Sequence, residues 1–185
     1  MHMAQLKRRW TRADLARTPD DGNIYEVIRG ELFVSPAPRF LHAFIAHFLA
    51  GALEQLVAQH RIGYVFHGRP AFVFEDSEVQ PDIVVSPYVS APPPEWEDAP
   101  LHLLVVEVLS PTTRRKDLTA KRALYVDAGI EYWIADGDQR AITVIRRDRP
   151  DEVVTDRLPW QPPGLTESLE LDVALIFRQA FGGVH

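Results

Sequence analysis

The 185-residue chain contains no cysteine, which excludes disulfide bonds and thiolate metal sites. Any metal would bind through oxygen or imidazole ligands, and a mostly carboxylate set would favour Mg²⁺, Mn²⁺ or Ca²⁺. The chain also lacks an uninterrupted apolar run near the ~20 residues of a membrane span. Its basic start, MHMAQLKRRW, lacks the apolar stretch of a secretory signal. We therefore expect a cytoplasmic protein that does not bind a membrane.

An excess of positive charge is absent as well. The chain has 20 Lys and Arg residues against 26 Asp and Glu residues, a formal net charge of -6. Proteins that bind nucleic acid regardless of sequence are usually basic, so the overall charge argues against that class. Basic residues nevertheless gather at one predicted helix start, at Arg114, Arg115, Lys116, Lys121 and Arg122. Because they oppose the helix macrodipole there, an anionic ligand would explain them, and a solvated helix start is the alternative.

The hydrophobic pattern predicts one α/β domain over residues 1–185, with a mixed central sheet flanked by helices and added β-hairpins. Residues 1–23 would form an N-terminal helical extension, and residues 160–185 a tail that packs on the core. Helical periodicity covers Arg39–Gln59 and Thr113–Ala128. The expected strands are Ile24–Ile28, Glu31–Val34, Gly63–Phe66, Ala71–Phe74, a segment beginning at Pro81, Leu101–Ser110, Ile130–Ala135, Ala141–Arg146 and Glu152–Thr155.

The segment Leu101–Ser110, LHLLVVEVLS, is typical of a central strand that is covered on both faces. Glu107 interrupts its apolar run, and a buried ionised carboxylate costs several kcal/mol (roughly) unless a cation, a metal or a proton compensates it. A second acid, Asp82, follows Pro81 at the start of an earlier strand. The length of the segment from Leu101–Ser110 through a helix to Ile130–Ala135 predicts a right-handed crossover between parallel strands.

If the two acidic strands are neighbours, Asp82 and Glu107 can share a hard divalent cation, and Lys121 on the next helix can reach the same point. Such a triad suits hydrolysis of a phosphodiester bond. Structural roles are the alternative: Asp82 could cap a turn, and Glu107 could form a buried ion pair with Lys121 or with an arginine. Asp117 and Lys121, four residues apart, could also form an ordinary helix ion pair.

The chain resembles the PD-(D/E)xK nuclease superfamily, in Pro81-Asp82 followed by Glu107-Val108-Leu109. More closely, it resembles the Uma family of restriction-endonuclease-like bacterial proteins. The stretches that carry this resemblance are Tyr25–Leu32, the proline loop with His42, Gln80–Val85, Val106–Thr113, Asp117, Lys121, Tyr125, Gly129 and Glu131–Trp133.

The resemblance implies a restriction-endonuclease-like core and a Mg²⁺-dependent DNA endonuclease, with Mn²⁺ as a possible substitute. Asp82 and Glu107 would be metal ligands together with the carbonyl of Val108. The superfamily lysine is replaced by Leu109, so Lys121 would have to supply the cation from the following helix. The remaining implied residues are Glu26 and His42, as a ligand or proton shuttle, and Arg114, Arg115 and Lys116, as phosphate contacts.

Two further expectations follow from the resemblance. Cutting both strands of a duplex commonly takes two sites, which makes a homodimer plausible. The alternative to an enzyme is a catalytically inactive protein on the same scaffold, acting as a nucleic-acid-binding or protein-interaction module.

Overall fold

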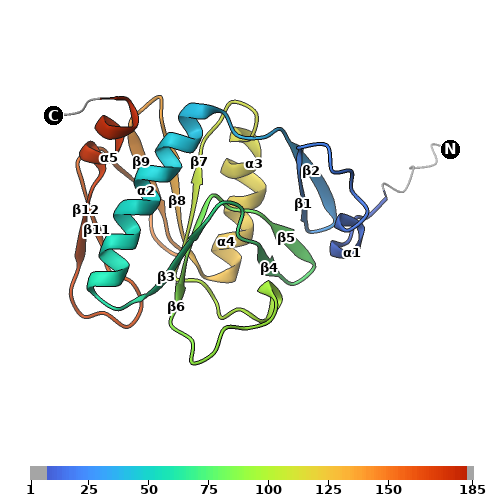
Figure 1. The fold of residues 1–185 in the computed structure, drawn as a ribbon, viewed down its shortest axis with the longest axis horizontal. Coiled ribbons are helices and arrows are strands. Elements are labelled where there is room, and N and C mark those ends of the chain that lie inside the picture. The colour runs from blue at the N-terminus through green and yellow to red at the C-terminus, as the bar shows by residue number, and fades with distance from the viewer. Residues whose placement is uncertain (1–7, 183–185) are drawn as a thin grey trace.

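The fold was analysed in a computed structural model that describes residues 8–182, so the ends of the predicted extension and tail lie outside the described residues. Three sheets and several helices form the described part (Figure 1). The helices are α1 (Arg12–Leu15), α2 (Phe40–Gln59), α3 (Arg114–Lys116), α4 (Arg122–Ala128) and α5 (Val173–Ala180), with a 3-10 turn over Trp96–Asp98 and a π-helical turn over Asp117–Lys121 between α3 and α4. The strands are β1 (Ile24–Ile28), β2 (Glu31–Ser35), β3 (Gly63–His67), β4 (Phe72–Phe74), β5 (Ser77–Val79), β6 (Ile83–Pro87), β7 (Leu104–Val108), β8 (Glu131–Asp136), β9 (Ala141–Ile145), β10 (Glu152–Val154), β11 (Arg157–Trp160) and β12 (Leu169–Asp172).

The central sheet has six strands in the order β10-β9-β8-β7-β6-β3. Strands β7 and β8 are parallel, as the crossover predicted, and the other pairs are antiparallel. The five residues of β7 are all buried, which explains the apolar composition of this strand. In the antiparallel pair of β6 with β7, Ile83 lies opposite Val106. One step further along the same register places Asp82 opposite Glu107.

The two faces of the central sheet are covered by different elements (Figure 1). On one face α2 and α5 pack with β11 and β12 into the larger core cluster, which includes Val106, Val108 and Trp133. On the other face α4 and residues of the four-stranded sheet, of order β2-β1-β5-β4, form a second cluster. Side chains alternate along a strand, so Glu107, between Val106 and Val108, points toward the α4 face.

Helix α2 packs its buried residues Ile45, Leu49, Leu53 and Val57 into the larger cluster. By length and composition alone, α2 is also apolar enough to cross a membrane, a test that the core helix of a soluble protein passes as well. Its contacts with β3, α5 and β7 place it as a packing helix of the domain.

The structure adds three features to the predicted elements. The acidic segment Glu75–Glu78, which is not among the expected strands, contributes to β5, which pairs with β1 and β4. Strand β3 joins the central sheet beside β6, while the next strand, β4, pairs with β5 in the four-stranded sheet. The tail folds into the β11–β12 hairpin and α5, whose apolar residues, including Trp160 and Phe177, lie in the larger cluster.

Candidate active site

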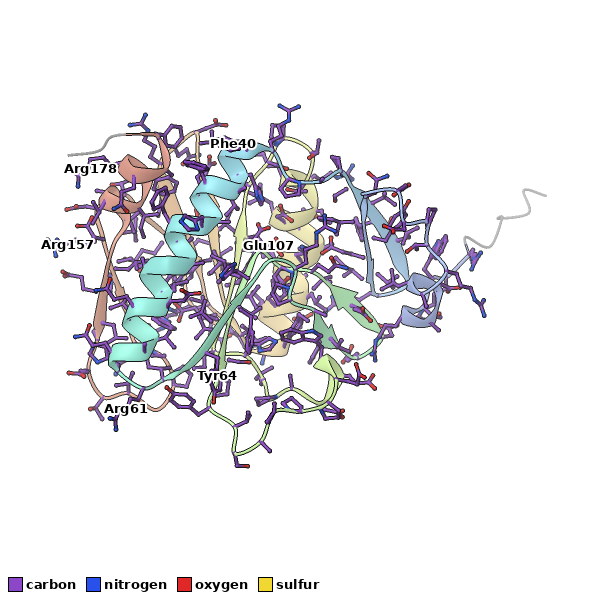
Figure 2. The ribbon with its side chains drawn as sticks, viewed as in Figure 1. Phe40, Arg61, Tyr64, Glu107, Arg157 and Arg178 are labelled. Atoms are coloured by element: carbon purple, nitrogen blue, oxygen red, sulfur yellow. The ribbon has the colours of Figure 1, made fainter. Side chains whose placement is uncertain are left out.

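The five side chains predicted to be catalytic line one cavity of about 500 Å³. They are Glu26 from β1, His42 from α2, Asp82 just before β6, Glu107 from β7 and Lys121 from the π-helical turn. Figure 2 labels Glu107 near the middle of the molecule, where these elements meet. The structure therefore brings together residues that lie as much as 95 positions apart in the sequence (Glu26 and Lys121).

The buried ammonium group of Lys121 binds two carboxylates at once. Its Nζ lies 2.6 Å from Oε1 of Glu107 and 2.8 Å from Oε1 of Glu26. The hydroxyl of Tyr125, one turn further along the helix, donates to the same Glu107 oxygen at 3.0 Å. Lys121, whose side chain is 2% exposed, thus compensates the charge that interrupts β7. This contact is the buried ion pair that the sequence allowed as an alternative, and it also places an ammonium group in the cavity wall.

Glu26 anchors the strand segment that carries Asp82. Its Oε1 accepts the backbone N–H of Gln80 at 2.8 Å, two residues before Asp82. Its Oε2 accepts from the ammonium group of Lys116, which also donates to the hydroxyl of Ser35 at 2.9 Å. Burial would raise the pKa of Glu26, but the positive charges of Lys121 and Lys116 outweigh it and hold the pKa below its ordinary value. Glu26 is therefore an ionised, fully satisfied carboxylate at the base of the site.

Asp82 is held by the strand next to it. The backbone N–H of Val108 donates to its Oδ2 at 2.7 Å, and Nε2 of His42 lies 3.1 Å from the same oxygen. This contact uses the N–H of Val108, while the sequence prediction concerned its carbonyl. Burial alone would lower the pKa of His42. The hydrogen bond to Asp82 and the negative charges of Asp82 and Asp117 have the larger, opposite effect, so the pKa of His42 is raised above its ordinary value.

The raised pKa of His42 predicts a pH-dependent contribution to stability. A histidine with a folded-state pKa above its unfolded value stabilises the fold fully below about pH 6.5, and this contribution is lost as pH rises through the raised pKa. We expect the variant His42→Asn to lose more unfolding free energy, relative to the wild type, at pH 6 than at pH 9. Urea unfolding of both proteins at the two pH values measures this difference. If His42→Asn loses the same unfolding free energy at pH 6 and at pH 9, the charge interaction between Asp82 and His42 is contradicted.

The inner wall of the cavity carries more acidic than basic side chains. Glu26, Asp82, Glu107 and Asp117 face the ammonium groups of Lys116 and Lys121, while two arginines that line the cavity are solvent-exposed. Four carboxylates therefore face two ammonium groups, and burial raises the pKa of Asp117 while the charge of Lys121 opposes that rise. Burial raises the pKa of Glu107 well above its ordinary value; the charge of Lys121 opposes this rise, and the neighbouring carboxylates add to it.

The donor set fits a hard cation in its chemistry. Carboxylate oxygens are the ligands that Mg²⁺ prefers, and both oxygens of Asp117 are buried without a hydrogen-bond partner among residues 8–182. Within that part of the chain, however, no three acidic or histidine side chains converge as a metal-binding cluster. Lys121 and Tyr125 engage one oxygen of Glu107, so a cation would have to bind with side-chain rearrangement.

One family model matches the chain over residues 12–174, and its description reads "Putative restriction endonuclease", Uma2. The chain belongs to the Uma2 family. Among solved structures, it is similar to one described as a putative nuclease belonging to DUF820 from Anabaena variabilis, with a TM-score of 0.73 and 21% sequence identity. That match covers 92% of this chain and 99% of the other, and it confirms the predicted mixed α/β nuclease fold. No curated protein matches the chain.

This Uma2 chain departs from the sequence prediction at the basic patch. Arg114 and Arg115 are exposed, and Arg114 pairs with Asp136 at 3.2 Å. Lys116, predicted to contact phosphates with them, is instead buried, because the next helical position turns it inward to Glu26 and Ser35. A lysine in a basic run looks the same in sequence whether it faces solvent or a buried acid.

Sequence reasoning missed three charged residues of the cavity. Arg39 precedes α2 and Arg69 lies in the turn after β3, and both are exposed. Arg39 shares the signal that singled out Arg114, a basic residue at a helix start. Asp117 was read only as an ion-pair partner of Lys121, but the described residues contain no such contact, since Lys121 binds Glu26 and Glu107.

Proposed function

We propose that this protein is a Mg²⁺-dependent endonuclease that hydrolyses phosphodiester bonds of DNA. One observation carries the proposal: Asp82, just before β6, and Glu107, near the end of the neighbouring strand β7, line one cavity with Lys121. Two carboxylates and an ammonium group on a nuclease-family fold suit phosphoryl chemistry, in which a metal and a cation stabilise negative charge on oxygen. The family membership supports nuclease chemistry in general.

Each residue has a distinct role in this proposal. Asp82, Glu107 and the carbonyl of Val108 would hold Mg²⁺, or Mn²⁺ in its place, which when bound polarises a phosphoryl oxygen. Lys121 holds an ammonium group at the cavity wall, where it orients an attacking water and stabilises developing negative charge. His42, hydrogen-bonded to Asp82, accepts or returns a proton at its ring. Glu26 is a positioning residue, because it fixes Lys121 and the backbone before Asp82.

The nucleic-acid contact in this proposal uses the exposed arginines around the cavity. Arg39 and Arg69 line it, and Arg114 and Arg115 follow the segment Ser110–Thr113, whose residues also line it. Guanidinium groups bind phosphate oxygens through two parallel hydrogen bonds, which suits recognition of a sugar-phosphate backbone. Lys116 is left out, since its ammonium group is buried against Glu26.

The proposal is tested by cleavage of plasmid DNA with Mg²⁺ or Mn²⁺. We expect Asp82→Asn and Glu107→Gln each to lower the cleavage rate about 100-fold or more, because each removes a carboxylate charge from the site. Asp127→Asn is the matched control: Asp127 is an exposed acid of α4, paired with Arg29, and its loss should leave the rate unchanged. Circular dichroism checks that all three variants are folded.

A folded wild type that cuts neither DNA nor RNA with either metal would contradict the enzyme. The inactive nucleic-acid-binding module is then the better interpretation. One observation favours it: Lys121 and Tyr125 already engage Oε1 of Glu107 within the described chain. In that case Asp82→Asn should bind DNA as tightly as the wild type.

A further inference from the structure

A row of exposed aromatic side chains lies outside the catalytic cavity, on β3 and the loop that follows β6. It consists of Tyr64, Phe66, Tyr88 and Trp96, which are between 37% and 50% exposed. The ring centroids of Tyr64 and Tyr88 are 4.9 Å apart, and those of Phe66 and Trp96 are 5.3 Å apart. Three of the four rings line a groove of about 620 Å³. Exposed apolar surface that gathers in one place marks a binding surface more often than isolated apolar residues do.

Strand β3 connects this row with the candidate active site. Phe66 lies opposite Val84, and Val84 lies opposite Val105. Both valines belong to the core cluster on the α4 face of the sheet, the face to which Glu107 points. The turn after β3, residues 67–69, lines the catalytic cavity itself. A ligand that leaves the cavity along β3 therefore meets the aromatic row within two residues.

Positive charge lies at both ends of β3. Arg61 precedes the strand and Arg69 follows it; both are exposed, and neither has an ion-pair partner among residues 8–182. They are eight residues apart, which is at most about 26 Å along an extended chain. Figure 2 shows Arg61 and Tyr64 at the end of β3 that is remote from Glu107. Toward the cavity, the strand thus presents a cation, two aromatic rings and a second cation.

We propose that this surface of β3 binds the unpaired bases of a single-stranded DNA segment that continues from the catalytic cavity. The inference rests on the proposed function for its class of ligand and extends that function to the strandedness of the substrate. Aromatic rings stack on unpaired bases, and exposed guanidinium groups bind the phosphates between them. The bases of a duplex stack on one another, so the row favours a single strand or an unpaired end over a duplex.

An acidic residue, Glu95, determines which wall of the groove the phosphates follow. Within the described part of the chain, the lining of the groove contains one charged side chain, that of Glu95, which lies on the loop beside Trp96. Because a carboxylate repels phosphate, the DNA backbone follows β3 and its arginines, and the bases reach the rings. We expect Glu95→Gln to bind single-stranded DNA about twofold more tightly or better, the effect of one exposed charge. Weaker binding by this variant would contradict a path along β3 and favour a basic peptide as the ligand.

The main test is fluorescence polarisation with the full chain and a labelled thymidine oligomer of about 12 nucleotides, compared with a duplex of the same length. EDTA in the buffer prevents cleavage. We expect Tyr64→Ala and Phe66→Ala each to weaken binding of the oligomer at least about fivefold, since one stacked base is lost, and to leave duplex binding unchanged. Arg61→Gln should make the affinity for the oligomer less dependent on salt, because one phosphate contact is lost. Val153→Ala is the control, since Val153 is 58% exposed on β10, at the opposite edge of the same sheet.

Three results would overturn the inference. The first is a wild type that does not bind the oligomer. The second is a pair of aromatic variants that bind the oligomer as tightly as the wild type, or that lose affinity for the duplex to the same extent. The third is a wild type that self-associates in sedimentation experiments while Tyr64→Ala is monomeric, which would make the row an interface between two copies of the chain.

These results are distinguishable from failure of the proposed function, which plasmid cleavage decides. Oligomer binding that depends on the aromatic row, in a wild type that cuts no DNA, would support this inference and contradict the enzyme. Circular dichroism checks that the variants are folded. If Phe66→Ala does not fold, Phe66→Leu, which keeps an apolar side chain and removes the ring, takes its place in the same comparison.

Discussion

Replacing Lys121 with methionine is expected to lower the free energy of unfolding by about 3–5 kcal/mol at pH 8, the usual cost of breaking a buried ion pair from one side. Methionine fills a similar volume, so the loss comes mainly from charge. Glu107 and Glu26 would remain buried, and the ammonium group that lies 2.6 and 2.8 Å from them would be gone. Glu26 would keep Lys116, but the Oε1 of Glu107 would keep only the hydroxyl of Tyr125.

The sign of the pH dependence follows from those carboxylates. Without Lys121, the pKa of Glu107, which burial already raises, rises further, so the folded variant binds more protons than the unfolded chain. Its stability therefore increases as pH falls toward the unfolded carboxylate pKa. Urea unfolding should give a smaller difference between wild type and Lys121→Met at pH 5.5 than at pH 8. A difference that grows toward low pH would contradict an ion-pair role for Lys121.

Two further variants sharpen this experiment. Adding Glu107→Gln to Lys121→Met should recover part of the lost stability, because the uncompensated carboxylate is removed with its partner. Arg122→Met, the next residue along the chain, is the matched control. Arg122 pairs with Asp151, and both side chains are 37% exposed, so its loss should cost at most about 1 kcal/mol. A cost for Lys121→Met no larger than this would show that the buried pair contributes little.

The sequence was most informative where the signal is local. The apolar run of β7 identified a buried strand, and its charged residue identified Glu107 as a site residue without any partner in view. The parallel pairing of β7 with β8 followed from the length of the intervening segment. Glu26 lies 81 residues before Glu107, and no local pattern connects the two. Its place in the site came from family resemblance and could not be worked out from spacing.

The sequence predictions were wrong or incomplete where the phase of a helix decides which side chains are buried, or where pairing between distant segments decides which residues form a strand. Lys116 and Asp117 lie just before and at the start of a π-helical turn, which changes the face that each following residue presents. No propensity scale indicates such a turn, so the buried position of Lys116 and the unpaired carboxylate of Asp117 could not be predicted. Strand β5 was missed because its acidic surroundings look like a solvated loop, and only pairing with β1 and β4 makes it a strand.

Acid is expected to cause a second large loss of stability, through a buried histidine next to the strand that carries Glu107. His102 lies two residues before β7 and is buried, with its Nδ1 2.6 Å from the hydroxyl of Ser86 on β6. Its ring lies beside Phe72, at 5.7 Å between centroids, and beside Trp96, at 6.3 Å. Burial among these groups lowers the pKa of His102 to about 4, so the ring is neutral in the folded protein near pH 7.

Because the unfolded chain binds this proton more readily, the stability gained from a neutral His102 is present above about pH 6.5 and lost as pH falls toward 4. A shift from 6.5 to about 4 corresponds to about 3 kcal/mol of unfolding free energy lost across that interval. We expect His102→Asn, which keeps a polar group for Ser86 but does not titrate, to remove most of this loss. Urea unfolding from pH 7.5 to 4 measures it, with His67→Asn as a control whose half-exposed ring meets water in both states. If the wild type and His102→Asn lose stability equally over this range, the acid sensitivity belongs to other groups, and a neutral buried His102 does not set it.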